Sequence, residues 1–281
     1  MIEMDRPAEP FRRIWNESLK GITDSAAHTR LTLIKAQANA ASDAYSHAAG
    51  AQSFTSVDRA GGMEIDPVRK SDLNSMYTSG LVMKKDGRKI YDRLKLSAPG
   101  GICPMCGDRA VENLDHHLPK SKYPALSIAP DNLVPCCRDC NTEKKDKVPT
   151  SNGATFLNPY FDRPNTGRWL VAATIPGPVP STIFKVQALA AWDSTLVLRV
   201  EHHFSKLKLA SYYAKRAAQL HSSKRTLYAN LLASVGPSAV KTHIEADADS
   251  AMSNRLNAWE TATYFAWASS DWYCRFGCAL R

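Results

Sequence analysis

Two pairs of cysteines, each with the spacing Cys-x-x-Cys, constrain the fold of this chain more than any other feature. Cys103 and Cys106 form the first pair, and Cys137 and Cys140 form the second. Each pair places two thiolates on one tight turn, so that two pairs can converge on a single tetrahedral ion. Gly107 directly follows the first pair and favours such a turn. The spacing therefore predicts a structural zinc site, which would stabilise a module too small to have its own core.

Three further cysteines need a separate interpretation. Cys136 offers a competing Cys-x-x-x-Cys spacing with Cys140, but the two-residue spacing favours Cys137 as the ligand. Cys136 is therefore interpreted as a small buried residue. Cys274 and Cys278 could bind a metal but lack evident partners, so we interpret them as free thiols.

Between the cysteine pairs lies a polar cluster that a structural zinc ribbon does not need. It comprises LDHHLPKSKYP at 114–124 and NLVP at 132–135, and CRDCNTEK follows at 137–144. The pattern DHxxP, then an asparagine, then CxxCNxxK, resembles the HNH endonuclease superfamily in its cysteine-containing form. The order, spacing and residue types agree from Cys103 to Lys147. The resemblance implies a ββα-metal fold in which a zinc ion is structural and a second ion is catalytic.

The resemblance also implies a role for each polar residue of the motif. Asp115 matches the first ligand of the catalytic metal, and His116 matches the general base that deprotonates the attacking water. Asn132 matches the middle letter of the family name, a residue that orients the base or holds the loop. Asn141 matches the third letter, where many members carry histidine. Because the Asp115 carboxylate and the Asn141 amide are hard oxygen ligands, we expect Mg²⁺ or Mn²⁺ at this site.

Phosphodiester hydrolysis explains why these residue types are needed. A neutral histidine near pH 7 accepts a proton from water, and a divalent ion neutralises charge on the phosphate. His117 is an alternative base, but strand alternation lets only one of two neighbours face a cleft. Lys120 and Lys122 are expected to contact phosphate, with a solvated loop as the alternative. Lys144 is expected either to steady the helix or to contact DNA.

The sequence predicts an α+β fold that is mainly helical, in three parts. Residues 1–98 are expected to form a helical region for docking or regulation, 99–165 the HNH module with its four-cysteine zinc site, and 166–281 strands followed by helices. The expected helices cover 10–20, 24–49, 71–94, 202–234 and 238–269, and the expected strands cover 169–175, 183–190 and 195–201.

Several residues are expected to end or divide these elements. Gly80 and Gly87 are expected to divide the helix over 71–94, which Ser71 or Asp72 would cap. A loop is expected over 53–67, with Gly61, Gly62 and Pro67 as helix breakers.

Charge and composition limit the functional class. The formal net charge is +9, which favours contact with nucleic acid through its phosphates. Residues 103–150 carry 7 basic and 7 acidic side chains, so the basic excess lies outside the cysteine-rich segment. A set of basic residues on the expected C-terminal helices is interpreted as either a DNA-binding or a solvated face: Lys206, Lys208, Lys215, Arg216, Lys224 and Arg225.

The location and partners are also expectations at this stage. No apolar run reaches the ~18 residues of a membrane span, and the polar N-terminus is unlike a signal peptide, so a cytoplasmic protein is expected. The wider pattern DHHLPKSKYP…NLVPCCRDCN, followed by NPYFD, is similar to nucleases of Septu-type and retron-linked anti-phage systems. That similarity implies an ATPase as partner subunit. DNA is the expected substrate, and RNA stays open. The alternative is a zinc-dependent nucleic-acid-binding or adaptor protein without catalysis.

Overall fold

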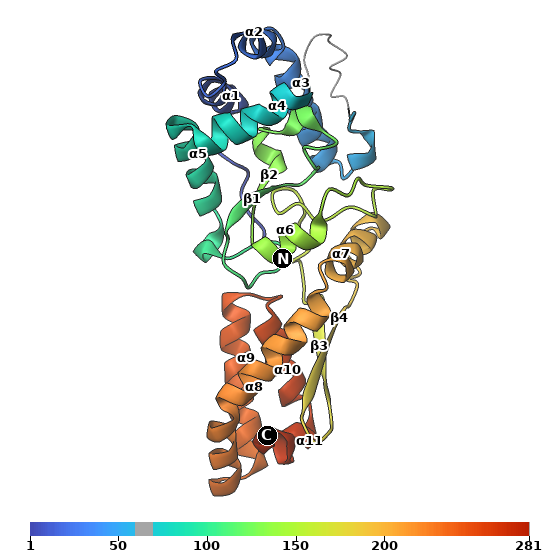
Figure 1. Cartoon of the computed structure of the whole chain (residues 1–281). Coiled ribbons are helices and arrows are strands. Elements are labelled where there is room, and N and C mark those ends of the chain that lie inside the picture. Colours follow the sequence, from blue (N-terminus) through green and yellow to red (C-terminus); the bar gives the residue numbers. More distant parts are fainter. Residues whose placement is uncertain (60–69, 281) are drawn as a thin grey trace. The chain divides into compact units, whose positions relative to one another are not determined.

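The computed structural model describes residues 1–59 and 70–280 (Figure 1). The chain divides into two compact units, Met1–Arg163 and Pro164–Arg281. Each unit is mainly helical and contains one two-stranded antiparallel sheet, so the expected α+β class is confirmed. Among the helices in the described part of the chain, none is long and apolar enough to cross a membrane.

The first unit contains both the N-terminal helices and the cysteine-rich segment. Its elements are α1 (Phe11–Leu19), α2 (Ser25–Leu33), α3 (Lys35–Gly50), α4 (Lys70–Ser75), the π-helix η2 (Met76–Met83), α5 (Lys85–Leu96), β1 (Asn113–His116), β2 (Leu133–Cys136) and α6 (Arg138–Lys144). The helix expected over 24–49 is divided at Ile34 into α2 and α3. Asp24 begins it as expected, because its carboxylate accepts hydrogen bonds from the first backbone N–H groups of α2.

The expected loop before α4 and the expected capping residue Asp72 are considered next. Gly61, Gly62 and Pro67 of the expected loop lie outside the described residues. Asp72 lies inside α4, where its carboxylate accepts two hydrogen bonds from Arg30 at 2.8 and 3.1 Å. It therefore ties α4 to α2.

A shared apolar core joins the helices to the sheet. Ile14, Leu81 and Ile90, from α1, η2 and α5, are buried in one cluster with Leu114 of β1 and Leu133 of β2. Burial of each such side chain stabilises the fold by roughly 1.5–3 kcal/mol. The N-terminal helices therefore supply much of the core that positions β1 and β2.

The predicted division of the third helix at Gly80 and Gly87 is wrong. The chain breaks at Lys84, which has extended backbone angles, while Gly80 lies inside η2 and Gly87 inside α5. Both glycines instead permit close backbone contact. A Cβ on Gly80 would lie 2.3 Å from the carbonyl oxygen of Ser18, and one on Gly87 would lie 2.1 Å from that of Gly80. These contacts pack η2 directly against α1 and α5.

The second unit packs a β-hairpin and several helices around its own core. Its elements are β3 (Leu170–Ile175), β4 (Ser181–Val186), α7 (Ser194–Lys206), α8 (Leu209–Ser234), α9 (Pro237–Asn254), α10 (Trp259–Ala268) and α11 (Asp271–Arg275). The two strands pair with Ala172 opposite Phe184. The strand expected over 183–190 thus begins and ends earlier. The helix expected over 202–234 is divided by Lys208, whose φ of +54° is left-handed.

The predicted strand over 195–201 is wrong, because this segment belongs to α7. Leu196 and Val200 are buried and four residues apart, which is helical spacing, whereas Leu198 is 54% exposed. Asp193 begins the helix, since its carboxylate accepts a hydrogen bond from the backbone N–H of Leu196 at 2.8 Å. Apolar residues at 196, 198 and 200 fit a strand, with its period of two residues. The pair at 196 and 200 also fits a helix, and the capping Asp193 favours the helix.

The last expected helix has different bounds in the structure, and two of the basic side chains have partners. The helix over 238–269 is divided into α9 and α10, and Pro237 begins the first part. Of the basic residues on the C-terminal helices, Lys224 forms an ion pair with Asp247 at 2.9 Å. The Arg216 guanidinium lies 5.0 Å from the ring centre of Trp259. These two side chains therefore make contacts within their own unit.

Candidate metal centre and active site

The four cysteines of the two pairs come together in the first unit. Their Sγ atoms lie within 4.8 Å of one another, and all four side chains are buried: Cys103, Cys106, Cys137 and Cys140. A tetrahedral zinc ion with Zn–S bonds of about 2.3 Å requires sulfurs roughly 3.8 Å apart. Gly107 has a φ of +65° and donates its N–H to the carbonyl of Cys103 at 2.7 Å, which makes the expected turn. The cluster therefore fits a zinc site.

The chemistry of four adjacent buried sulfurs favours a bound cation. Hydrogen bonds from Cys103 and the other thiols lower the pKa of Cys137. Four thiolates cannot share one buried site unless a cation compensates their charge. Cys137 also caps α6, because its sulfur accepts the N–H of Cys140 at 3.4 Å. The zinc ligands therefore fix the start of the helix that carries Asn141 and Lys144.

The remaining three cysteines are not members of this four-sulfur group, although the Cys136 thiol lies within hydrogen-bond reach of Cys103, Cys137 and Cys140. Cys136 is buried at the end of β2, where its carbonyl accepts the N–H of Glu112 at 3.0 Å. Cys274 and Cys278 belong to the second unit and are buried in its apolar core. The Cys274 thiol donates to the carbonyl of Trp267 at 3.5 Å.

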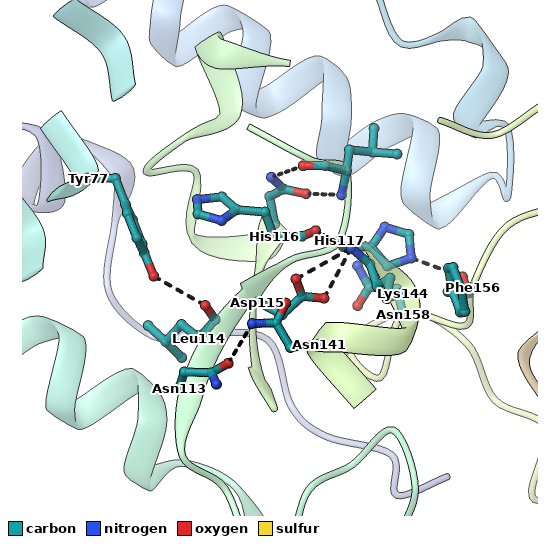
Figure 2. A network of polar contacts seen from close by, with 12 residues as sticks. Tyr77, Asn113, Leu114, Asp115, His116, His117, Asn141, Lys144, Phe156 and Asn158 are labelled. Carbon is teal, nitrogen blue, oxygen red and sulfur yellow. Dashed lines mark hydrogen bonds and ion pairs between the residues drawn. The ribbon is translucent and has the colours of Figure 1, made fainter. Parts of the chain in front are cut away.

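Asp115 lies on β1 and meets Lys144 of α6 (Figure 2). The Lys144 ammonium is 3.1 Å from one carboxylate oxygen of Asp115 and 3.5 Å from the other. It also donates to the carbonyl of His116 at 2.6 Å. Burial raises the pKa of Asp115, and the positive charge of Lys144 opposes this change. Lys144 is 2% exposed, so the geometry favours its helix-steadying role over a surface contact with DNA.

His116 has one ring nitrogen fixed and the other available. Its Nε2 atom lies 2.8 Å from the carbonyl oxygen of Ser127. Because a carbonyl oxygen only accepts hydrogen bonds, Nε2 carries the hydrogen and Nδ1 keeps its lone pair. Burial lowers the pKa of His116 to about 3, so the ring is neutral at pH 7. This arrangement can accept a proton at Nδ1.

His117 points to the opposite side of β1 and has both nitrogens engaged (Figure 2). Its Nε2 donates to the carbonyl of Phe156 at 2.9 Å, which leaves Nδ1 to accept the hydroxyl of Tyr45 at 3.1 Å. Asn158 then donates to the same hydroxyl at 2.9 Å. This buried network ties β1 to α3 and to the NPYFD segment. Of the two neighbouring histidines, His116 is therefore the one suited to proton transfer.

The two motif asparagines have different surroundings. The side chain of Asn132 accepts the N–H of Leu118 at 2.7 Å and donates to the carbonyls of Leu118 and Leu126 at 3.0 and 3.1 Å. It thereby holds the loop after β1. Asn141 is partly exposed on α6, and its Nδ2 donates to Asn113 at 3.3 Å. The amide oxygen of Asn141 and the carboxylate of Asp115 are both oxygen donors of the kind that hard divalent ions prefer.

The two remaining expected phosphate contacts differ in their surroundings. Lys122 is exposed, whereas Lys120 is partly buried with its ammonium 5.3 Å from the ring centre of Tyr77. The Tyr77 ring in turn packs edge-on against His116, with centroids 4.5 Å apart. Sequence reasoning missed Tyr77 and Tyr45, because nothing local in the sequence links residues of the N-terminal helices to β1.

A short sheet followed by a helix, with a four-cysteine cluster and an Asp-His pair, defines a ββα-type metal-binding module. Residues 103–147 match the family model for HNH endonuclease, so this segment is an HNH endonuclease domain. Among curated proteins, the chain is similar to Protein ea31 of Escherichia phage lambda, with 36% identity over 155 residues. The match covers 53% of this chain and 52% of that protein, so the chain spans about half the length of this relative. No solved structure matches the chain.

Proposed function

We propose that this protein is a metal-dependent endonuclease that hydrolyses phosphodiester bonds in nucleic acid, with DNA as its substrate. The observation that carries the proposal is the state of His116. Its Nε2–H is held by the carbonyl of Ser127, so Nδ1 keeps the lone pair that a general base needs, one residue after Asp115 on β1. The HNH match over 103–147 supports the same chemistry.

Each residue of the site has a separate role in the proposed hydrolysis. His116 accepts a proton from the attacking water at Nδ1, and the Ser127 carbonyl keeps the ring in the required tautomer. Asp115 and Asn141 would hold a Mg²⁺ or Mn²⁺ ion, which supplies charge neutralisation and orientation at the scissile phosphate when bound. Cleavage at the 3′ oxygen would leave a 5′-phosphate and a 3′-hydroxyl. Lys120 lies near enough to His116 for its charge to affect the pKa of the ring, and is the lysine best placed to meet a phosphate.

The zinc site has a structural role in this proposal. Four thiolates leave no open coordination position on a tetrahedral ion, so the zinc takes no part in hydrolysis. It fixes the start of α6 through Cys137, and α6 carries Asn141 and Lys144. The zinc therefore acts on catalysis by holding these side chains opposite β1.

We also propose that the nuclease serves as the effector of an anti-phage system with an ATPase partner. The pattern DHHLPKSKYP…NLVPCCRDCN followed by NPYFD supports this assignment. The test is to search the neighbouring genes for one that encodes an ATPase, to co-express the two proteins, and to purify either protein through a tag on the other. Co-purification together with reduced phage plaque counts supports the role. A chain that neither binds the ATPase nor lowers plaque counts excludes it.

The endonuclease activity is tested directly with purified protein and supercoiled plasmid. We expect nicking or linearisation with Mg²⁺ or Mn²⁺ and none in buffer without divalent ions. Matched single-stranded DNA and RNA substrates identify the preferred nucleic acid. The nicked product should be sealed by DNA ligase, which requires a 5′-phosphate next to a 3′-hydroxyl. Nicks that ligase cannot seal would exclude the proposed bond cleavage, and metal-dependent binding without any cleavage would favour the adaptor alternative.

A further inference from the structure

The free edge of β1 is covered by two tyrosines from the N-terminal helices. Among the residues that the structure describes, β1 pairs only with β2, on one edge, and Leu114 lies opposite Pro135, which has no N–H to donate. The Tyr91 hydroxyl accepts the N–H of Leu114 at 3.2 Å, and the Tyr77 hydroxyl donates to the carbonyl of Leu114 at 3.2 Å. Both backbone groups of the residue before Asp115 are thereby satisfied.

Tyr77 makes a second contact that Tyr91 does not share. Its ring lies 4.5 Å from the His116 ring, centre to centre, with an angle of 65° between the planes. The positive edge of one aromatic ring against the face of another is a favourable arrangement. His116 is therefore held at two points, by the Ser127 carbonyl at Nε2 and by the ring of Tyr77, which Figure 2 shows on the same side of β1 as the His116 ring.

The element that carries Tyr77 is itself firmly placed. Tyr77 is the second residue of the π-helix η2, a rare conformation that is frequent at functional sites. Backbone contact at Gly80 with Ser18, and at Gly87 with Gly80, leaves no room for a side chain between η2, α1 and α5. The position of the Tyr77 ring is thus set by the helical region, outside the 103–147 domain.

We propose that Tyr77 is a positioning residue for the nuclease site, supplied by the N-terminal helical region of the same chain. The inference rests on the function proposed above. The Tyr77 ring restricts rotation of the His116 imidazole, so that Nδ1 keeps one direction, while its hydroxyl fixes the backbone before Asp115. A base displaced by about 1 Å costs on the order of 100-fold in rate. The helical region is therefore part of the catalytic unit, and not only a docking surface.

Three variants of the full chain separate positioning from general stability. Tyr77→Phe keeps the ring against His116 and loses the hydroxyl bond. Tyr77→Leu loses both of these contacts and also the ring under the Lys120 ammonium. Tyr91→Phe is the control: it loses a hydroxyl bond to the same residue, Leu114, and its hydroxyl contact with Tyr77, but it keeps its ring against Tyr77 and does not touch His116. We expect Tyr77→Leu to lower kcat by about 10- to 100-fold with KM changed less than about 3-fold. Tyr77→Phe and Tyr91→Phe should both stay within about 5-fold of wild type.

A readout independent of cleavage is the NMR signal of the His116 ring, assigned by comparison with His116→Ala. In wild type and Tyr77→Phe we expect one ring conformation with hydrogen on Nε2. In Tyr77→Leu we expect averaging between ring orientations. If the wild type does not cut any nucleic acid but this NMR pattern appears, the proposed function fails and the positioning of the ring by Tyr77 stands. An unchanged ring signal in Tyr77→Leu, or Tyr77→Phe as impaired as Tyr77→Leu, overturns the inference.

Discussion

The ammonium of Lys144 lies 3.1 Å from a carboxylate oxygen of Asp115, and both side chains are buried. A buried pair of this kind costs desolvation energy, and removing one partner leaves an uncompensated charge. The same ammonium donates to the carbonyl of His116, so a single side chain of α6 holds two residues of β1. In the proposed nuclease, Lys144 therefore keeps the carboxylate in place before a divalent ion arrives.

Replacing Lys144 by methionine keeps the length of the side chain and removes its charge. We expect this variant to lower the opening free energy of β1 and α6 by about 3–5 kcal/mol, because Asp115 is left buried without a partner. Amide hydrogen exchange without added Mg²⁺ measures this quantity. Lys147→Met, three residues later and less buried than Lys144, should change it by less than about 0.5 kcal/mol. Equal protection in both variants would show that the buried pair does not support the module.

The zinc assignment predicts different outcomes for two adjacent cysteines. Cys137→Ala removes a ligand, so we expect loss of the single bound zinc and unfolding of the module at a temperature well below that of wild type. Cys136→Ala should retain one zinc per chain, because Cys136 is outside the four-sulfur group. Elemental analysis and thermal unfolding of the purified variants check both points. Retention of zinc by Cys137→Ala with loss in Cys136→Ala would reverse the ligand assignment.

His117 is predicted to act on stability and not on hydrolysis. His117→Phe would leave the Tyr45 hydroxyl and the Phe156 carbonyl without this partner, at a cost of about 1–3 kcal/mol for each buried group. Cleavage per folded molecule should fall less than about 5-fold. Thermal unfolding and single-turnover cleavage, measured on the same preparation, give both values. A loss of cleavage with unchanged stability would instead make His117 the base.

The buried neutral ring of His116 predicts a loss of stability in acid. Its pKa is lowered from 6.5 to about 3, chiefly by burial and also by the nearby charges of Lys120 and Lys144. Between these two values the unfolded chain binds a proton that the folded chain excludes, so stability falls as the pH drops from about 6.5 toward 3. Urea unfolding at several pH values should show a smaller pH dependence for His116→Gln than for wild type. An identical dependence would mean that this ring does not titrate as described.

The sequence predicts the residues of the candidate site better than it predicts how the helices pack around them. Cys-x-x-Cys spacing and the Asp-His pair are local patterns, so they predict the four-sulfur cluster and the strand that carries Asp115. The contact of Tyr77 with His116 depends on how η2 packs against α1 and α5, which no local pattern encodes. The same limit explains the errors at Gly80, where a glycine needed for tight packing resembles a helix break, and at 195–201, where the exposed Leu198 completes an apparent strand pattern.

The measurement that tests the proposed function most directly is single-turnover cleavage of plasmid by wild type and by His116→Ala, with Mg²⁺ or Mn²⁺. His28→Ala, at an exposed position on α2, is the control. We predict that His116→Ala retains its zinc and cleaves about 10²–10⁴-fold more slowly per folded molecule. The control should cleave at the wild-type rate. Equal cleavage by wild type and His116→Ala, or no cleavage by either even with the partner ATPase, would contradict the assignment of His116 as the base of a nuclease.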